Sequence, residues 1–425
     1  MPVLALTGSR SEGREVLGGK AWSITEMLRH EIPVPPAFVL TTDECGRYYE
    51  AGRAVPEDVL ALLPAAMCRL EGETGRTFGG GERPLLVSVR SGAPTSMPGM
   101  MDTVLNLGMT DEVEAALATA SGSPSYAADT RRRFLEQYEK VVGEPAPAAP
   151  WDQLKRAIAA VFDSWRSDRA IAYRAERSIP DEGGTAVTVQ AMVFGNLDAR
   201  SGTGVLFSRD PLGASDEPYG EWLPQGQGED VVSGAFDPLG IDAMAAALPE
   251  AHAQLLDVAR RLDEAAGVAQ DIEFTVESGR LWLLQARAAK VAGAGAAFDS
   301  GDAEVLASGR PASPGIVTGV VVTDVDDAEL RALDGEDVIL ARPTTNPHDV
   351  RAMAVVRGIL TEIGGATSHA AVVSRELGVP CVVGCGAGSL AGLDGRVVTV
   401  DAGAGRVLDG AVAPRALQDH PTTAA

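Results

Sequence analysis

The chain has 425 residues, of which 45% are hydrophobic and 22% charged, and its formal net charge at pH 7 is −23. This composition is typical of a globular protein with two or three domains, each able to bury its own core. The acidic surplus argues against a nucleic-acid-binding protein, because phosphate neutralisation over a large surface needs a surplus of Lys and Arg. Binding of a small anionic ligand is compatible with this net charge, because a few arginines in one cleft dominate the local potential.

The sequence predicts a cytoplasmic protein without a membrane segment. The first residues lack the basic-then-apolar order of a signal peptide, and no stretch reaches about 18 uncharged apolar residues. Four cysteines do not make a disulfide framework in a chain of this length. Cys381 and Cys385 have no second pair of ligands nearby in the sequence, so they are predicted to be small buried residues and not a zinc site.

The first part of the chain mixes helices and strands. Residues 16–45 predict a glycine loop, an amphipathic helix and an apolar strand entered through prolines. Residues 85–109 predict a strand, a loop rich in Gly, Pro and Ser, and a second strand. Helical periodicity covers residues 126–142, 151–178 and 241–267, strands are predicted at 186–194 and 205–208, and residues 271–287 predict a hairpin around Ser278-Gly279.

A change of composition at residues 291–303 predicts a flexible linker, because these residues are small and lack an apolar period. The residues that follow, 304–412, alternate strands and helices and predict a compact α/β domain. Its strands are expected at 315–323, 337–342, 358–362, 381–384 and 397–402, with a helix near 349–356. Residues 413–425 are predicted to form a disordered tail.

One histidine, His369, stands at a predicted helix start within the sequence GGATSHAAVVSRELGVP. Thr367 or Ser368 can serve as the N-cap, Gly378 suits the left-handed position after the last turn, and Pro380 prevents continuation. Free backbone N–H groups and the helix dipole attract an anion there, so a neutral imidazole is well placed to receive a phosphoryl group. A histidine that only packs at a helix start fits the same local pattern, and both interpretations stay open.

Three cationic residues stand at the ends of predicted elements in the first part. Lys20 follows two glycines, Arg90 ends an apolar strand before the glycine-containing loop, and Arg287 ends the second strand of the hairpin. Cations beside glycine-lined backbone suit a polyphosphate, because fixed positive charge offsets the repulsion between a nucleophile and phosphate. Each residue alone is weak evidence, since surface arginines are usually solvated.

Each strand of the predicted hairpin places two polar residues on the same face of that strand. Asp271 and Glu273 are two residues apart on one strand, and Gln285 and Arg287 are two apart on the other. Oxygen atoms of Glu273 and Gln285 beside a guanidinium can hold Mg²⁺ that bridges the phosphates of a nucleotide. A salt-bridged exposed sheet face explains the pattern equally well, so these two interpretations are evenly supported.

Several motifs carry a resemblance to a known family. LGGKAWSITEM, LLVSVRSGAPTSMPGMMDTVLNLG, VTVQAMVFGNLDARSGTGVLFSRDP, GEDVVSG and DIEFTVESGRLWLLQAR resemble the ATP-grasp nucleotide-binding part of pyruvate, phosphate dikinase. LASGRPASPGIVTG and GILTEIGGATSHAAVVSRELGVPCVVG resemble the swivelling phosphohistidine domain of that family. The resemblance is collinear over almost all of residues 14–410. It implies an α+β ATP-grasp domain over residues 1–290 and a smaller α/β swivelling phosphohistidine domain over residues 304–412.

Carried over position by position, the resemblance implies roles for individual residues. His369 matches the phosphorylated histidine, with Arg90 and Arg287 as its catalytic partners, while Glu273 and Gln285 match the Mg²⁺ ligands. Thr367 matches a regulatory threonine that plant versions phosphorylate. The loop Ser96–Thr103 covers the phosphates of ATP, and the segment from Gln190 to Val193 matches the adenine-contacting strand. The implied nucleotide contacts are Lys20, Arg90, Ser96, Gly99, Thr103, Gln190, Met192, Val193, Glu229, Glu273, Gln285 and Arg287.

The resemblance also implies a reaction. In such enzymes the histidine takes a pyrophosphoryl group from ATP and releases AMP, and inorganic phosphate then removes the outer phosphoryl group as pyrophosphate. Two segments differ from the usual sequence of the family, LPQGQGEDVVSGAFDP and TTNPHDV. These differences leave the step with inorganic phosphate open. Because the histidine must reach ATP and then another acceptor, its domain is predicted to swing on residues 291–303.

The final phosphoryl acceptor is left open by the sequence. The family's C-terminal α/β barrel, which binds pyruvate and phosphoenolpyruvate, has no counterpart in these residues, so pyruvate is expected on a separate barrel protein and not on this chain. A small-molecule acceptor, as in antibiotic phosphorylation, and a nucleotide-binding regulatory protein without turnover are the alternatives.

Overall fold

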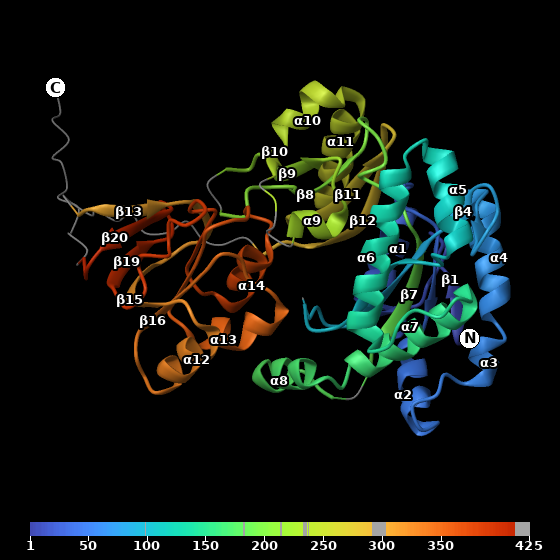
Figure 1. The fold of residues 1–425 in the computed structure, drawn as a ribbon, viewed down its shortest axis with the longest axis horizontal. Coiled ribbons are helices and arrows are strands. Elements are labelled where there is room, and N and C mark those ends of the chain that lie inside the picture. The colour runs from blue at the N-terminus through green and yellow to red at the C-terminus, as the bar shows by residue number, and fades with distance from the viewer. Residues whose placement is uncertain are drawn as a thin grey trace. The chain divides into compact units, whose positions relative to one another are not determined.

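The computed structural model describes residues 1–412 except 98, 182, 213–214, 233–235, 237 and 291–302. The predicted tail 413–425 and all but the last residue of the predicted linker 291–303 therefore lie outside the described residues. The chain, shown in Figure 1, divides into two compact units. The first contains Met1–Gly202 and Ile272–Arg287, and the second contains Thr203–Asp271 and the chain from Ala288 onward. The domain boundaries predicted from the sequence stay a prediction.

The first unit is built on an antiparallel sheet with the strand order β1-β2-β7-β5-β6. These strands are β1 (Val3–Ala5), β2 (Ala37–Leu40), β5 (Val87–Gly92), β6 (Thr103–Leu107) and β7 (Ala186–Ala191), and a short parallel pair is formed by β3 (Thr77–Phe78) and β4 (Pro84–Leu85). The helices are α1 (Arg14–Arg29), α2 (Thr42–Glu50), α3 (Glu57–Leu60), α4 (Leu63–Thr74), α5 (Asp111–Ser121), α6 (Pro124–Val142), α7 (Pro150–Ser164) and α8 (Asp168–Glu176).

Two glycines bring α1 close to the end of β5. Gly18 interrupts α1 with φ 71° and ψ 161°, a conformation that only glycine adopts without strain. A Cβ atom at Gly18 would lie 1.7 Å from the carbonyl oxygen of Gly92, so no side chain fits there. The amide of Gly19 donates to the carbonyl of Ala93 at 2.9 Å. This contact sets Lys20, the next residue of α1, against the backbone at the end of β5.

The predicted hairpin is confirmed as β11 (Gln270–Glu277) and β12 (Arg280–Ala288). Its turn residues, Ser278 and Gly279, have φ values of 50° and 84°, as a tight two-residue hairpin turn requires. The prediction of one helix over 151–178 is wrong, because the helix is interrupted between α7, which ends at Ser164, and α8, which begins at Asp168. Ser167 caps the second of these helices by accepting a hydrogen bond from the amide of Ala170.

The second unit begins at Thr203, the second residue of β8 (Gly202–Phe207). It continues with β9 (Tyr219–Pro224), α9 (Gly228–Val232) and β10 (Leu239–Gly240), and β9 lies between β10 and β8. The helix predicted over 241–267 is again two helices, α10 (Asp242–Ala247) and α11 (Pro249–Ala266). Pro249 stands at the first position of α11, where its missing N–H costs nothing, whereas a continuous helix would leave a carbonyl without its donor.

The rest of the second unit surrounds an eight-stranded sheet with the order β13-β20-β19-β15-β16-β17-β18-β14. Strands β15 to β18 are parallel neighbours and the other pairs are antiparallel. The strands are β13 (Val305–Ser308), β14 (Arg310–Ser313), β15 (Ile316–Val322), β16 (Val338–Arg342), β17 (Gly358–Thr361), β18 (Cys381–Val383), β19 (Val397–Asp401) and β20 (Arg406–Asp409), and the helices are α12 (Val325–Leu333), the short 3₁₀ helix η1 (Pro347–Asp349), α13 (Val350–Val355) and α14 (His369–Leu377).

Only Gly309 separates β13 from β14, although these strands stand at opposite ends of the sheet order. The amide of Gly309 donates to the carbonyl of Gly405, which precedes β20, at 2.9 Å. A Cβ atom on Gly309 would lie 2.5 Å from the carbonyl oxygen of Val383, which ends β18. The sheet therefore curls until its two edges approach each other at this glycine.

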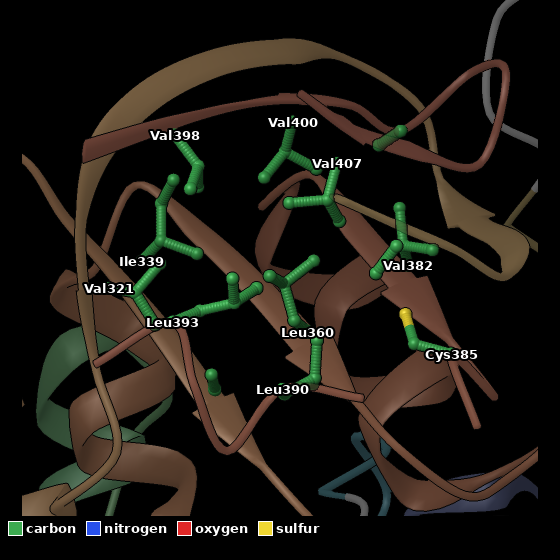
Figure 2. Packing of buried hydrophobic residues seen from close by; sticks show 13 residues of the cluster. Val321, Ile339, Leu360, Val382, Cys385, Leu390, Leu393, Val398, Val400 and Val407 are labelled. Atoms are coloured by element: carbon green, nitrogen blue, oxygen red, sulfur yellow. The ribbon is translucent and has the colours of Figure 1, made fainter. Parts of the chain in front are cut away.

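The curled sheet encloses a core of small and branched apolar side chains, which Figure 2 shows from close by. Cys385 belongs to this core, and burial raises the pKa of its thiol to about 12. Cys381 is likewise a buried free cysteine, so the prediction that both are small buried residues is confirmed. The cluster consists of Ala307, Val321, Ile339, Ala341, Leu360, Val382, Cys385, Leu390, Leu393, Val398, Val400, Ala402 and Val407.

None of the helices in the described part of the chain has the length and apolar character needed to cross a bilayer.

Candidate functional site

The guanidinium group of Arg90, near the end of β5, is surrounded by three side-chain oxygen atoms in the first unit. Its Nη2 lies 3.4 Å from Oε2 of Glu273 and 3.5 Å from Oε1 of Gln285, and its Nη1 lies 3.5 Å from Oε1 of Gln190. These separations exceed the usual hydrogen-bond distance of about 2.9 Å, so each contact is weak. The structure thus brings together residues of β5, β7, β11 and β12 around one cation that is held only loosely.

Lys20 belongs to the same group of charges. Burial of its ammonium group lowers the pKa of Lys20 to about 7, the positive charges of Arg90 and Arg287 lower this pKa further, and the negative charge of Glu273 raises it. Near pH 7 the side chain of Lys20 is therefore close to half-protonated. A polyanion bound beside it would favour the charged form.

The predicted phosphate-covering loop leads from β5 to β6. Ser96 is exposed, and its Oγ lies 3.5 Å from Nη1 of Arg287. Gly99 has a left-handed φ of 70°, which favours glycine at this position. Thr103 begins β6 and pairs with Arg90 across the sheet. Ser96 and Thr103 therefore lie near Arg287 and Arg90, while contact of all three loop residues with a nucleotide stays a prediction.

Arg169 of α8 anchors this loop, and sequence reasoning missed it. Its Nε donates to the carbonyl of Met100 at 3.1 Å, and its Nη2 forms an ion pair with Asp102. No local pattern around Arg169 could have indicated this contact, because its two partners lie more than sixty residues earlier in the chain.

The segment expected to contact adenine lies at the end of β7. Gln190 is buried, and its Nε2 donates to the carbonyl of Pro35 at 3.1 Å. The amide of Met192 donates to the carbonyl of Leu86 at 2.9 Å, and Val193 is half-buried. This segment is thus tied to its neighbours on both sides, while its contact with a base stays a prediction.

Arg76 and Glu277 hold the same segment from outside the sheet. Nη1 of Arg76 donates to the carbonyl of Met192 at 3.2 Å, and Nη2 of Arg76 lies 3.1 Å from Oε2 of Glu277. Oε1 of Glu277 accepts from the amide of Phe194 at 3.2 Å. Glu277 could have been found from the sequence, because it follows Glu273 by four residues on one strand and so lies on the same face.

The predicted nucleotide contact Glu229 lies in α9, which belongs to the second unit, and its side chain is outside the described part of the chain.

His369 is the first residue of α14, as the capping pattern predicts. Ser368 is the N-cap residue, with an extended backbone and no side-chain capping hydrogen bond. Gly378 adopts the left-handed conformation after the last turn, with φ 73°, and its amide donates to the carbonyl of Ser374. The start and the end of this helix were therefore both predicted correctly.

The imidazole ring of His369 has one nitrogen with a partner and one without. Nδ1 lies 3.0 Å from Oγ1 of Thr345, whereas Nε2 is buried and has no hydrogen-bond partner among the described residues. Burial lowers the pKa of His369 to about 4, so the ring is neutral at pH 7. In a neutral imidazole one nitrogen keeps a lone pair, and this nitrogen is the unpartnered Nε2 when Nδ1 carries the hydrogen. Sequence reasoning did not identify Thr345.

A buried carboxylate on β9 holds the loop that precedes His369. Oε1 of Glu221 accepts from the amide of Ala366 at 2.9 Å, and Oε2 accepts from the amide of Thr367 at 3.0 Å and from its hydroxyl group. Nη1 of Arg310 lies 3.1 Å from the same carboxylate. A Cβ atom on Gly365 would lie 2.0 Å from Oε1, which explains the glycine. Thr367 is buried, and its regulatory modification stays a prediction.

Comparison with known proteins finds a family match in the first part of the chain and another in the part that contains His369. Residues 53–246 match the family described as "Pyruvate phosphate dikinase, AMP/ATP-binding domain", and residues 333–405, which include His369, match "PEP-utilising enzyme, mobile domain". The chain therefore carries a nucleotide-binding domain of the ATP-grasp type and a mobile domain, and the predicted α+β fold class is confirmed. These matches and the curated relatives show that the chain is similar to pyruvate, phosphate dikinases over most of its length.

The curated relatives come from plants and bacteria. The chain is 40% identical to pyruvate, phosphate dikinase 2 of Zea mays, with 88% of this chain and 52% of the relative covered. It is 38% identical to the pyruvate, phosphate dikinase of Rhizobium meliloti (strain 1021), with 95% and 56% covered, and 38% identical to that of Clostridium symbiosum, with 88% and 52% covered. The chain thus spans about half the length of the curated relatives it matches.

Proposed function

We propose that this chain is an ATP-dependent phosphotransferase that forms phosphohistidine at His369. In the proposed reaction His369 takes a pyrophosphoryl group from ATP and releases AMP, and inorganic phosphate then removes the outer phosphoryl group as pyrophosphate. The observation that carries the proposal is the neutral imidazole at the start of α14, whose Nε2 has no partner among the described residues. The matches to an AMP/ATP-binding domain and to a mobile domain support it.

The cations of the first unit are proposed to bind the phosphates of ATP. Lys20, Arg90 and Arg287 bring positive charge to one place, and such charge offsets the repulsion between a nucleophile and a polyanion. Arg90 is suited to this role because its contacts with Glu273 and Gln285 are long, so little is lost when phosphate oxygens replace them. We propose that Arg90 and Arg287 also stabilise the charge that develops during transfer.

Glu273 and Gln285 are proposed to hold Mg²⁺, as in our interpretation of the hairpin. One carboxylate oxygen and one amide oxygen approach the same Nη2 atom of Arg90, at 3.4 and 3.5 Å, so both face one point. Two hard oxygen donors fit Mg²⁺, which takes its remaining ligands from phosphate and water. Within the described residues no cluster of three or more His, Cys, Asp or Glu side chains is placed to hold a metal, so the nucleotide would have to complete this site. When bound, the ion would neutralise phosphate charge.

We propose pyruvate as the final phosphoryl acceptor, because the relatives that the chain matches are named pyruvate, phosphate dikinases. The expectation that a separate barrel protein binds pyruvate stays a prediction. It is tested by adding ATP, inorganic phosphate and pyruvate to the purified chain and measuring phosphoenolpyruvate. Turnover by the chain alone would contradict the expectation of a separate pyruvate-binding protein.

Phosphohistidine formation is tested with ATP labelled with ³²P at the β-position. We expect label on the protein that is lost in acid and kept in base, and no label from ATP that is labelled at the α-position. In His369→Asn the label should disappear, whereas His348→Asn should keep it, because His348 is an exposed histidine on the same domain. Label that survives acid, or that persists in His369→Asn, would refute the proposed function.

A further inference from the structure

The loop after β16 runs beside the loop after β17, and this brings Thr345 to His369. The two strands are parallel neighbours, so their carboxyl ends lie at the same edge of the sheet. The amide of Glu362 donates to the carbonyl of Arg342 at 3.0 Å, and the amide of Ile363 donates to the carbonyl of Pro343, also at 3.0 Å. The position of Thr345 next to the histidine is therefore set by backbone pairing and not by a flexible side chain.

The residues that follow Thr345 hold it from the other side. In the capping box of η1, the amide of Asn346 donates to Oδ2 of Asp349 at 3.0 Å, and the amide of His348 donates to Oδ1 of Asn346 at 2.9 Å. Asp349 is buried and faces Arg342, whose Nε lies 4.0 Å away. Thr345 is itself only 5% exposed, so its side chain is largely shielded from water.

The hydroxyl group of Thr345 can decide which nitrogen of His369 carries the proton. A neutral histidine in water favours the form with hydrogen on Nε2, and this form has no lone pair on Nε2. The hydroxyl group of Thr345, 3.0 Å from Nδ1, can donate or accept a hydrogen bond, and when it accepts, Nδ1 carries the hydrogen. Nε2 then keeps its lone pair, and this nitrogen is the one that is buried without a partner among the described residues.

We propose that Thr345 is a positioning residue that accepts a hydrogen bond from Nδ1–H of His369 and thereby keeps the lone pair on Nε2. The inference rests on the proposed function, because it names the atom of His369 that would react. The lone pair of Nε2 attacks the β-phosphorus of ATP, and the P–O bond to the α-phosphate breaks with its electrons leaving on AMP. No proton has to leave Nε2, and the hydrogen stays on Nδ1, hydrogen-bonded to Oγ1 of Thr345, throughout.

The proton position can be measured without any nucleotide. In protein labelled with ¹⁵N-histidine, at pH 7.5, we expect a protonated Nδ1 and an unprotonated Nε2 for the ring signals that vanish in His369→Asn. Thr345→Val removes the hydroxyl group at similar volume, and we expect it to move the hydrogen to Nε2. Thr345→Ser keeps a hydroxyl group and should restore the wild-type signals. Wild-type protein with hydrogen on Nε2 would overturn the inference by itself, whatever the variants do.

The same variants are then compared in the labelling reaction with ATP. We expect phosphohistidine to form about 10- to 100-fold more slowly in Thr345→Val, with most of the rate restored in Thr345→Ser. Thr344→Val is the matched control, since Thr344 is the adjacent threonine, and it should label like wild type. Equal rates in Thr345→Val and Thr345→Ser would refute the positioning role. Hydrogen on Nδ1 without any labelling of wild type would refute the proposed function and leave the assignment of the proton intact.

Discussion

The charged group around Arg90 and the loop before His369 differ in how firmly their partners hold them. The contacts of Arg90 with its three oxygen neighbours are 3.4 to 3.5 Å long, and the side chain of Glu273 is 35% exposed. In the loop, Glu221 accepts two backbone hydrogen bonds at 2.9 and 3.0 Å, and its side chain is only 2% exposed.

This difference agrees with what the two sites are proposed to do. A site for a polyphosphate must exchange its internal contacts for contacts with the ligand, so weak and partly solvated contacts lower the cost of binding. A nucleophile must instead be neutral and oriented before the reaction begins, so a buried loop held by short hydrogen bonds favours transfer. The predictions below test this contrast, beginning with the largest effect.

The first prediction concerns Arg90, the centre of the loosely held group. Arg90→Met should weaken the binding of Mg-ATP about 10- to 100-fold, because a charge-assisted contact contributes about 1.5–3 kcal/mol. Titration calorimetry measures this effect. Arg83→Met is the matched control, since Arg83 is an exposed arginine just before the same strand, and its affinity should equal that of wild type. Unchanged affinity in Arg90→Met would place the nucleotide elsewhere.

The second prediction concerns Glu221, the centre of the firmly held loop. Glu221→Gln replaces one acceptor by an amide donor that faces other donors, so a backbone N–H of Ala366 or Thr367 loses its partner. The local cost should be about 1–3 kcal/mol, which corresponds to roughly five- to a hundredfold faster amide hydrogen exchange at these two residues. The exposed neighbour Glu217 provides the control variant Glu217→Gln. If both variants exchange at the wild-type rate, the loop does not depend on Glu221.

The third prediction concerns the proton on Lys20 and has the smallest effect. Its pKa of about 7 leaves the side chain mostly neutral at pH 8 in the free protein. Bound phosphates favour the ammonium form and raise this pKa, so ATP binding at pH 8 should take up close to one proton. Below about pH 6 the uptake should vanish, because Lys20 is then already protonated.

Proton uptake is measured by calorimetry in two buffers with different ionisation enthalpies. The observed binding enthalpy should differ between the buffers at pH 8 for wild type, and this difference should disappear in Lys20→Met. An equal enthalpy in both buffers for wild type would contradict the assignment of Lys20 to the nucleotide site.

Sequence patterns predicted the parts of both sites that depend on local periodicity. Alternation put Asp271 and Glu273 on one face of the first hairpin strand and Gln285 and Arg287 on one face of the second, and the structure places Glu273 and Gln285 beside Arg90. The capping pattern located the two ends of α14, at Ser368 and Gly378. In each case a few neighbouring residues determine the geometry, and so a single sequence is sufficient.

The residues that sequence reasoning missed are those that act across long stretches of chain. Thr345 meets His369 because two parallel strands end at the same edge, and Glu221 reaches Thr367 from 146 residues away. The sequence near Thr345 or Glu221 contains no pattern that predicts these contacts. The two helix breaks were missed for a different reason, since the apolar period continues through Trp165 and Leu248 although the backbone does not.

The single glycine between β13 and β14 limits where the chain can be cut to produce a stable fragment. Because β13 covers β20 and β14 covers β18, one short stretch of chain protects both edges of the eight-stranded sheet. A fragment that begins after Ser313 would uncover two strands at once, each with a row of unpaired backbone donors and acceptors. Uncovered edges of this kind recruit strands from other molecules. A fragment that contains the domain of His369 and is intended to stay monomeric should therefore begin before Glu304.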